Sequence, residues 1–274
     1  MFTVTIMNKL RHIFVSLFLL LAVANTVYSR GSTDDKWLKW GPSNQNTRMG
    51  VIARAGYTIG GTTPMPLPPE IRSIKEFSPK GGFTVGADLY KMVSRRWGVS
   101  AGWHFFYEGF HTVAEVKSYK MSLTMEGNTM AGYFTGTDVT NTYMWGMTVP
   151  LLATFCISPR WNINAGPYLS AYLKKYFGGS VYDNNKGIGY LRVDTPTGEK
   201  VNMDRSNPAT YDFSHDMHSW SGGIELGLDW KATTDINVFA KVDWSLSNIW
   251  ESGFDAVAFR MYPIYATFGA AYRY

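Results

Sequence analysis

From Met49 to the end of the chain, apolar and polar residues alternate with a period of two, which is the side-chain period of a β-strand. Glycine, proline and clusters of polar residues interrupt the alternation and divide this part of the chain into separate strands. Each strand is long enough to cross a bilayer when tilted, which takes roughly 9–11 residues. The eight predicted strands are residues 49–60, 82–93, 97–107, 143–157, 161–173, 219–230, 236–246 and 261–274.

The two faces of these strands differ in kind. One face is apolar, and the other carries charged side chains among Ser, Thr and Gly. In a soluble β-sandwich the apolar face packs inward, whereas in a membrane barrel it meets lipid and the polar face lines the lumen. A barrel would therefore enclose a network of lumen charges, for which structural ion pairing is the ordinary explanation. The network comprises Arg54, Asp88, His104, Glu225, Asp229, Lys241, Asp243 and Arg273.

The lengths of the connections separate these two architectures. Short links at 94–96, 158–160 and 231–235 alternate with long links at 61–81, 108–142, 174–218 and 247–260. Short turns at one end and long loops at the other are typical of outer-membrane barrels, in which the short turns are periplasmic and the long loops extracellular.

Aromatic residues on the apolar face gather at the ends of the strands. Amphipathic rings prefer the headgroup level of a bilayer, so two girdles of this kind indicate a lipid-facing surface. The sequence thus predicts an all-β fold, an eight-stranded antiparallel transmembrane β-barrel of the outer-membrane type, with a soluble secreted β-sandwich as the minor alternative. The predicted girdles are Trp97, Trp161, Trp230 and Tyr274 at the short-turn end, and Tyr57, Tyr107, Trp145, Trp220, Trp244 and Tyr262 at the long-loop end.

The N-terminal region predicts export. Lys9 and Arg11 precede an apolar core at residues 13–23, which is the pattern of a cleaved signal peptide spanning residues 1–29. Cleavage is expected after Ser29, or alternatively after Ala24. Residues 30–48 would then be a periplasmic lead-in and residues 49–274 the barrel. The aromatic final residue, Tyr274, is similar to the signal that the barrel-assembly machinery of Gram-negative bacteria reads.

Composition narrows the remaining function classes. Charged residues make up 17% and aromatic residues 16% of the 274 residues, and the formal net charge is only +5. This mild charge and the predicted export both argue against a nucleic-acid partner. The single cysteine, Cys156, cannot form an internal disulfide. We found no phosphate-binding or zinc-binding sequence motif, and we expect no cofactor, no metal and no catalytic residue.

The middle of the chain resembles a known family. The run Val-Pro-Leu-Leu-Ala-Thr-Phe at 149–155 is followed by Trp-Asn-Ile-Asn-Ala-Gly-Pro-Tyr-Leu at 161–169. Together they resemble the PorT-like outer-membrane β-barrel family of the Bacteroidota, although Thr148 stands where that family often has Glu. The resemblance implies a non-enzymatic protein of the cell envelope, associated with secretion and in particular with type IX secretion. It implies outer-membrane lipids, the barrel-assembly machinery and secretion or envelope proteins as partners.

Four questions stay open at this level. The lumen charges would also suit a narrow channel for ions or small solutes. A lipid-modifying enzyme would need His104 and an inward Ser100, but four residues along a strand separate them by about 13 Å. The cluster around His215 and His218 is better explained as a solvated loop than as a zinc site. The aromatic long links either form adhesive loops or extend the strands above the membrane; their aromatic and methionine residues include Met121, Met125, Met130, Tyr133, Phe134, Tyr176, Phe177, Tyr182, Tyr190 and Tyr211.

Overall fold

The computed structural model describes residues 49–94, 96–194, 198–257 and 259–274. The predicted signal peptide and periplasmic lead-in lie outside this range and stay predictions. Across the described part of the chain, none of the helical segments has the length and apolar character required to span a bilayer.

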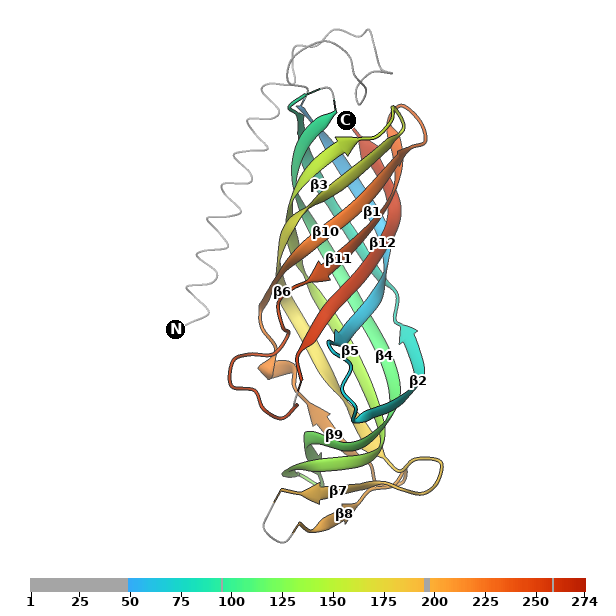
Figure 1. The fold of residues 1–274 in the computed structure, drawn as a ribbon, viewed down its shortest axis with the longest axis vertical. Coiled ribbons are helices and arrows are strands. Elements are labelled where there is room, and N and C mark those ends of the chain that lie inside the picture. The colour runs from blue at the N-terminus through green and yellow to red at the C-terminus, as the bar shows by residue number, and fades with distance from the viewer. Residues whose placement is uncertain (1–48, 95, 195–197, 258) are drawn as a thin grey trace. The chain divides into compact units, whose positions relative to one another are not determined.

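Eight strands close into a ring (Figure 1). Each neighbouring pair is antiparallel, in the order β1–β3–β4–β5–β6–β10–β11–β12, and the last strand pairs with the first. In the closing pair, Ile52 lies opposite Arg273 and Pro64 opposite Met261. The predicted eight-stranded antiparallel barrel is therefore confirmed. Its strands are β1 (Met49–Pro64), β3 (Gly82–Met92), β4 (Trp97–Met125), β5 (Asn128–Cys156), β6 (Trp161–Tyr182), β10 (Trp220–Lys231), β11 (Ile236–Ser245) and β12 (Met261–Arg273).

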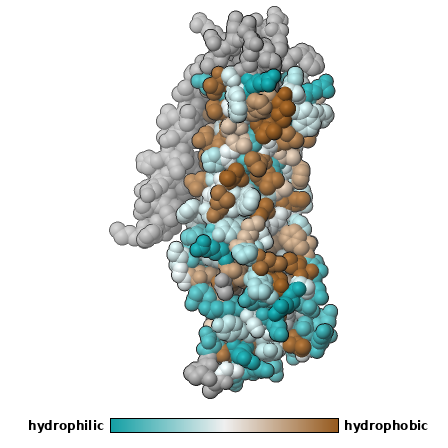
Figure 2. Space-filling model, viewed as in Figure 1, coloured by the Kyte–Doolittle hydropathy of each residue, from teal (hydrophilic) through white to brown (hydrophobic). Residues whose placement is uncertain are grey.

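The alternation in the sequence becomes an inside and an outside. Along β1, Ala53, Ala55 and Tyr57 are exposed, whereas Ile52 and Thr58 are buried in the barrel interior. The other strands repeat this arrangement, and hydrophobic side chains spread over the outer surface of the strands (Figure 2). An apolar exterior of this kind is stable in hydrocarbon, because the closed ring leaves no backbone edge without a partner.

The three short turns share one device. In each, a hydroxyl accepts a hydrogen bond from the backbone N–H that opens the next strand. Ser94 accepts from Trp97 at 3.1 Å, and Ser158 accepts from Trp161 at 3.2 Å. Thr233 does the same for β11. Polar turn residues therefore satisfy the backbone groups that the strands leave unpaired.

The long links contain more strand than the sequence pattern predicted. β4 and β5 continue past the predicted strand ends as one hairpin, which turns at Glu126 and Gly127, both with positive φ. The sequence left adhesive loops and strand extension open, and the structure shows extension. Shorter elements add to this end: β2 (Ile71–Pro79), β7 (Tyr190–Val193), β8 (Lys200–Asn202), β9 (Ala209–Asp212) and the 3-10 turn η2 (Ser214–Asp216).

Two apolar clusters fill the inside. A small cluster near the short turns contains Ile52, Tyr90, Cys156, Phe239 and Ala271. A far larger one, which we call the extracellular core, lies at the long-loop end. It combines residues of the lengthened strands with residues of the links, and it includes Phe106, Phe110, Tyr119, Met121, Leu123, Phe134, Met144, Phe177, Val181, Leu191, Met203, Tyr211, Phe213, Met217, Ile249, Trp250, Val257, Met261 and Tyr265.

Candidate functional site

The lumen charges come together in two clusters between the apolar ones. In the first, Arg54 on β1 bridges two carboxylates, with its Nε 2.6 Å from Asp88 and its Nη1 2.7 Å from Asp229. A second guanidinium hydrogen bond reaches Asp229 at 3.0 Å, so this contact is bidentate. His104 lies with Nε2 2.9 Å from the other oxygen of Asp88. The alternation of apolar and polar residues along each strand places these side chains inside the barrel. Arg54 on β1 and Asp229 on β10 meet only because the closed ring brings these two strands to face each other across the lumen.

The second cluster uses one lysine and two acids. Lys241 on β11 lies 2.9 Å from Glu225 and 2.9 Å from Asp243. Glu225 and Asp243 are directly opposite each other on β10 and β11, and Lys241 lies two residues along the strand from Asp243. Like-charged carboxylates at such positions repel each other, so the lysine stabilises both.

Arg273 belongs to neither cluster. It is buried near the short turns, and its guanidinium carbon lies 5.1 Å from the ring centroid of Tyr90. A cation over an aromatic face is attracted by the ring quadrupole, so this contact stabilises the buried charge.

Further polar residues complete this interior. Asn164 donates to Asp229 at 2.7 Å and accepts from Thr154 at 2.8 Å. Glu108 is also buried at this level of the barrel. The sequence analysis placed Glu108 in a link, yet it continues the inward period of His104 and Phe106 by one more step. That period was the signal that would have found it.

The predicted girdle residues lie on the outer surface. Trp97, Trp161 and Trp230 sit at the short-turn ends of β4, β6 and β10 and are exposed. The girdle at the long-loop end includes Tyr107 and Trp145, whose ring centroids are 4.9 Å apart. Of the remaining girdle residues, Tyr57, Trp220, Trp244 and Tyr274 are exposed and Tyr262 is half-buried.

The residues considered for an enzyme do not assemble into a catalytic group. His104 uses its Nε2 toward Asp88, and Ser100 pairs across the strands with Leu152 and Tyr90 rather than lying beside the histidine. Within the described ranges, no set of three or more His, Cys, Asp or Glu side chains is placed to hold a metal ion, and this includes the surroundings of His215 and His218.

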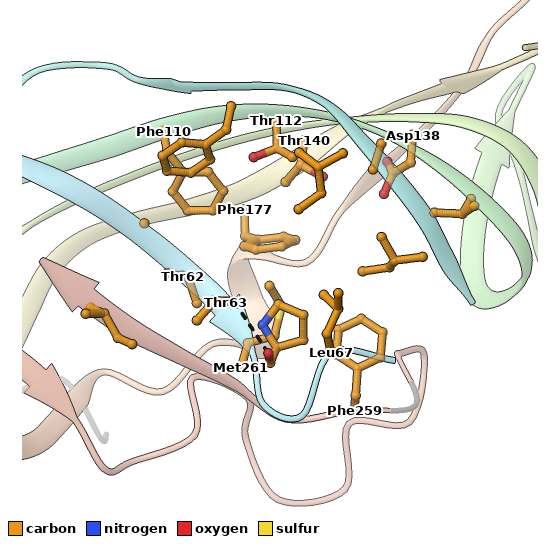
Figure 3. Close-up of a pocket in the computed structure, with 18 of the residues that line it drawn as sticks. Thr62, Thr63, Leu67, Phe110, Thr112, Asp138, Thr140, Phe177, Phe259 and Met261 are labelled. Atoms are coloured by element: carbon orange, nitrogen blue, oxygen red, sulfur yellow. Dashed lines mark hydrogen bonds between the residues drawn. The ribbon is translucent and has the colours of Figure 1, made fainter. Parts of the chain in front are cut away.

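A cavity of about 390 Å³ opens in the barrel wall at the long-loop end (Figure 3). Its walls come from β1, β2, β4, β5 and β6 and from β12 with the segment before it. They are mostly apolar, and Phe110 and Phe177 are two of the aromatic residues that line it. The polar lining includes Thr112, Thr140 and Asp138. The sequence analysis missed this cavity, because its walls are separate in sequence and meet only through the barrel topology.

Asp138 is the charged group of this cavity. It is buried, and it accepts a hydrogen bond of 2.8 Å from the hydroxyl of Tyr211 on β9. The Thr140 hydroxyl lies 2.8 Å from the same Tyr211 hydroxyl and also hydrogen-bonds to Asp138. Burial raises the pKa of the Asp138 carboxyl to about 6, and the hydrogen bonds oppose that shift only in part.

The closed antiparallel ring, its apolar exterior and its ion-paired interior define a transmembrane β-barrel of the outer membrane. The chain belongs to the outer membrane protein beta-barrel domain family, whose model matches residues 43–251. This match gives the class of protein and its location. The finer resemblance to PorT-like proteins stays a prediction.

The chain is also similar to several solved structures. Ail, the attachment invasion locus protein of Yersinia pestis, is 12% identical with a TM-score of 0.37, over 82% of this chain and 98% of that one. CarO2 of Acinetobacter baumannii is 14% identical with a TM-score of 0.38, over 84% and 100%. OprG of Pseudomonas aeruginosa is 11% identical with a TM-score of 0.33, over 86% and 99%. No curated protein matches the chain.

Proposed function

We propose that this chain is a non-enzymatic outer-membrane barrel that acts by binding an envelope or secretion protein at the cell surface. The binding part would be the extracellular extension, which we define as residues 108–142 of the β4–β5 hairpin together with β7, β8 and β9. The observation that carries the proposal is the extracellular core, which organises these long links into a packed sheet.

A packed sheet suits binding better than mobile loops do. A binding surface that is already ordered loses little conformational freedom when a partner docks, so more of the contact energy becomes affinity. The extension also presents exposed aromatic surface, of which Tyr133 on β5 is an example. Aromatic side chains of this kind are common anchors in protein interfaces. The PorT-like resemblance of residues 149–169 supports a secretion-associated partner, type IX secretion included.

The test removes the outer part of the extension and keeps the barrel. Residues 117–135 are replaced by Asn-Gly, a pair that favours tight hairpin turns, between Val116 and Gly136, which lie opposite each other in the hairpin. In the producing bacterium, the trimmed barrel should shift on a cold SDS gel only when boiled, yet show the secretion defect of a complete deletion. Normal secretion by cells with the trimmed barrel, when the deletion strain is defective, would overturn the proposal.

A point variant guards against a folding defect in the trimmed chain. Tyr133→Glu changes only an exposed side chain of the extension, and it should weaken secretion while the heat-dependent gel shift stays normal. A glutamate introduced in the membrane-spanning part, such as Ala101→Glu, would not serve as a control for this added charge, because residue 101 faces lipid. Lys200→Glu on β8 tests whether any charge change on the extension has the same effect.

A narrow channel is the second candidate, and the composition of the lumen favours it. Each cluster holds two carboxylates for one Arg or Lys, so a conducting path would select cations. A planar bilayer would then show discrete conductance steps, which Glu225→Ala or Lys241→Ala would alter. Since the extracellular core packs apolar side chains across the long-loop end, the binding proposal expects a silent barrel.

A further inference from the structure

The proposed function leaves the cavity in the barrel wall unexplained. This cavity lies where the hydrogen-bonded pairing between neighbouring strands is interrupted. β1 pairs with β3 only as far as Thr58 opposite Gly82. Beyond that point β2 takes the place of β3 beside β4, from Pro79 opposite Phe110 to Ile71 opposite Val116. Residues 59–64 of β1 meanwhile pair with β12. Among the described strands, β2 has β4 as its hydrogen-bonded neighbour and none on the side of β1, so the wall opens between β1 and β2.

Apolar side chains surround this opening. Leu67, Ile74 and Phe77 line the cavity and are all more than half exposed, at 57%, 54% and 51%. Phe77 stacks on Phe110 of β4 at a centroid distance of 6.1 Å, so the rim continues into the cavity wall. Exposed apolar residues around a cavity mouth are characteristic of ligand-binding sites.

The floor of the cavity is supported from behind by a packed aromatic pair. Phe177 is buried, and its ring meets Trp250 edge-on at a centroid distance of 4.9 Å. Figure 3 shows Phe177 between the β4–β5 side of the cavity and the side formed by Thr62, Leu67 and Phe259. A volume of about 390 Å³ falls within the range of small-molecule pockets, roughly 300–1,000 Å³.

The two ends of the cavity differ in chemistry. Phe110 and Asp138 lie toward opposite ends of the view in Figure 3. The register agrees, since Asp138 pairs with Ala114, four residues along β4 from Phe110, which is about 13 Å. One end is therefore aromatic, and the other carries a carboxylate.

That carboxylate has no cation to balance it. In the described part of the chain, no Lys, Arg or His forms an ion pair with Asp138, which hydrogen-bonds to the hydroxyls of Tyr211 and Thr140. A buried carboxylate without a counter-ion is costly, and a cationic ligand group in the cavity would reduce that cost. An anionic head group would instead be repelled.

We propose that this cavity binds a small apolar amine, with its hydrocarbon part against Phe110 and Phe177 and its ammonium group donating to Asp138. The ligand would enter through the gap between β1 and β2. The cavity is lined in part by residues of the extracellular extension, among them Ala114, Asp138 and Thr140, but its ligand is a small molecule and its binding does not depend on the protein partner proposed above.

The test uses the whole barrel in lipid nanodiscs and the fluorescent probe 1-aminoanthracene, whose aryl amine is uncharged at neutral pH, so the probe reports occupancy of the apolar part of the cavity. Its emission should rise on binding to the wild type. Ala114→Phe, which fills the cavity from a buried wall position, should weaken binding at least tenfold. Ala131→Phe adds the same side chain at an exposed site of the same hairpin and should bind as the wild type does. Equal binding by all three proteins would overturn the proposal.

Competition then tests the head group. Octylamine, octanol and octanoate share a chain length and differ in charge, and octylamine should displace the probe best and octanoate worst. Asp138→Asn should remove the advantage of octylamine over octanol. Equal displacement by all three competitors would mean that the cavity takes a hydrocarbon chain of any lipid, and the amine assignment would be wrong. The secretion assay with the trimmed barrel is read independently of either result.

Discussion

Replacing Arg54 by Met tests the ion-paired interior most directly. The guanidinium contacts Asp88 at 2.6 Å and Asp229 at 2.7 Å, and only 10% of its side chain is exposed. At an effective dielectric constant of about 20, two opposite charges about 4 Å apart attract each other by roughly 4 kcal/mol. Two such contacts give a gross attraction of about 8 kcal/mol, from which the cost of burying the arginine is subtracted.

The net loss of unfolding free energy depends on the charged groups that stay buried after the substitution. Arg54→Met leaves Asp88 with His104 and Asp229 with Asn164 but removes the guanidinium that balances both buried carboxylates. Removal of one partner of a buried ion pair typically costs about 3–5 kcal/mol, which we take as the expected size here. The free energy of unfolding is measured by urea titration of the barrel in phospholipid vesicles, with the heat-dependent gel shift as a second readout. Arg192→Met, an exposed substitution on β7, is the matched control and should change stability by less than about 0.5 kcal/mol.

Rescue separates this explanation from lost packing. Asp88→Asn and Asp229→Asn, combined with Arg54→Met, remove the uncompensated charges and should recover most of the lost stability. The reasoning is refuted if Arg54→Met unfolds within about 1 kcal/mol of the wild type, or if the triple variant is no more stable than the single one. The second outcome would assign the effect to the contact between Arg54 and Phe239, whose ring centroid is 5.1 Å from the guanidinium carbon.

Two further predictions concern space and protonation. Gly102→Ala places a methyl group against the carboxylate of Asp88, so we expect poor folding into vesicles, whereas Gly227→Ala meets its nearest neighbours at 3.6 Å and should fold normally. Band-shift assays after refolding compare the two, and equal yields would contradict the prediction. Because the pKa of Asp138 is raised from 3.8 to about 6, its contribution to stability is complete only below the unfolded pKa and is lost as the pH rises through the folded pKa. Relative to Asp138→Asn, the wild type should lose up to about 3 kcal/mol of unfolding free energy between pH 4 and pH 7, and parallel urea titrations without that difference would refute the assignment.

The membrane-spanning part was predictable because lipid imposes a strict rule on it. Every outward position from Ala53 to Tyr57 must be apolar and every inward one must fit a narrow lumen, so alternation alone places each strand and its faces. The same rule placed Arg54 and Asp229 inward. It gave no information on their pairing, since 175 residues separate them and only the closed ring brings them together.

The extension escaped prediction because no lipid enforces a pattern there. Along β4 the buried positions run through Ala114 and Val116, then change phase at an irregularity and continue with Tyr119 and Met121. Ser118, at that irregularity, has a φ of 55°. A single extra residue shifts the buried side chains from even-numbered to odd-numbered positions. A prediction that requires the same alternation throughout therefore ends the strand too early. The cavity is less predictable still, because it depends on a missing pairing between β1 and β2.

The extracellular core constrains how the protein is assembled. Its residues come from β4, β5, β6, the links around β9 and the segment before β12, so it is complete only after the last strand has closed the ring. Until then, we expect the hairpin that turns at Glu126 and Gly127 to cross the membrane while these large apolar side chains are still unpacked. These side chains must be kept from aggregating during transit, and the sheet that they build forms on the far side of the membrane. Packing of that core after transit would make withdrawal of the hairpin through the narrow, side-chain-filled lumen unfavourable, so insertion would proceed in one direction only.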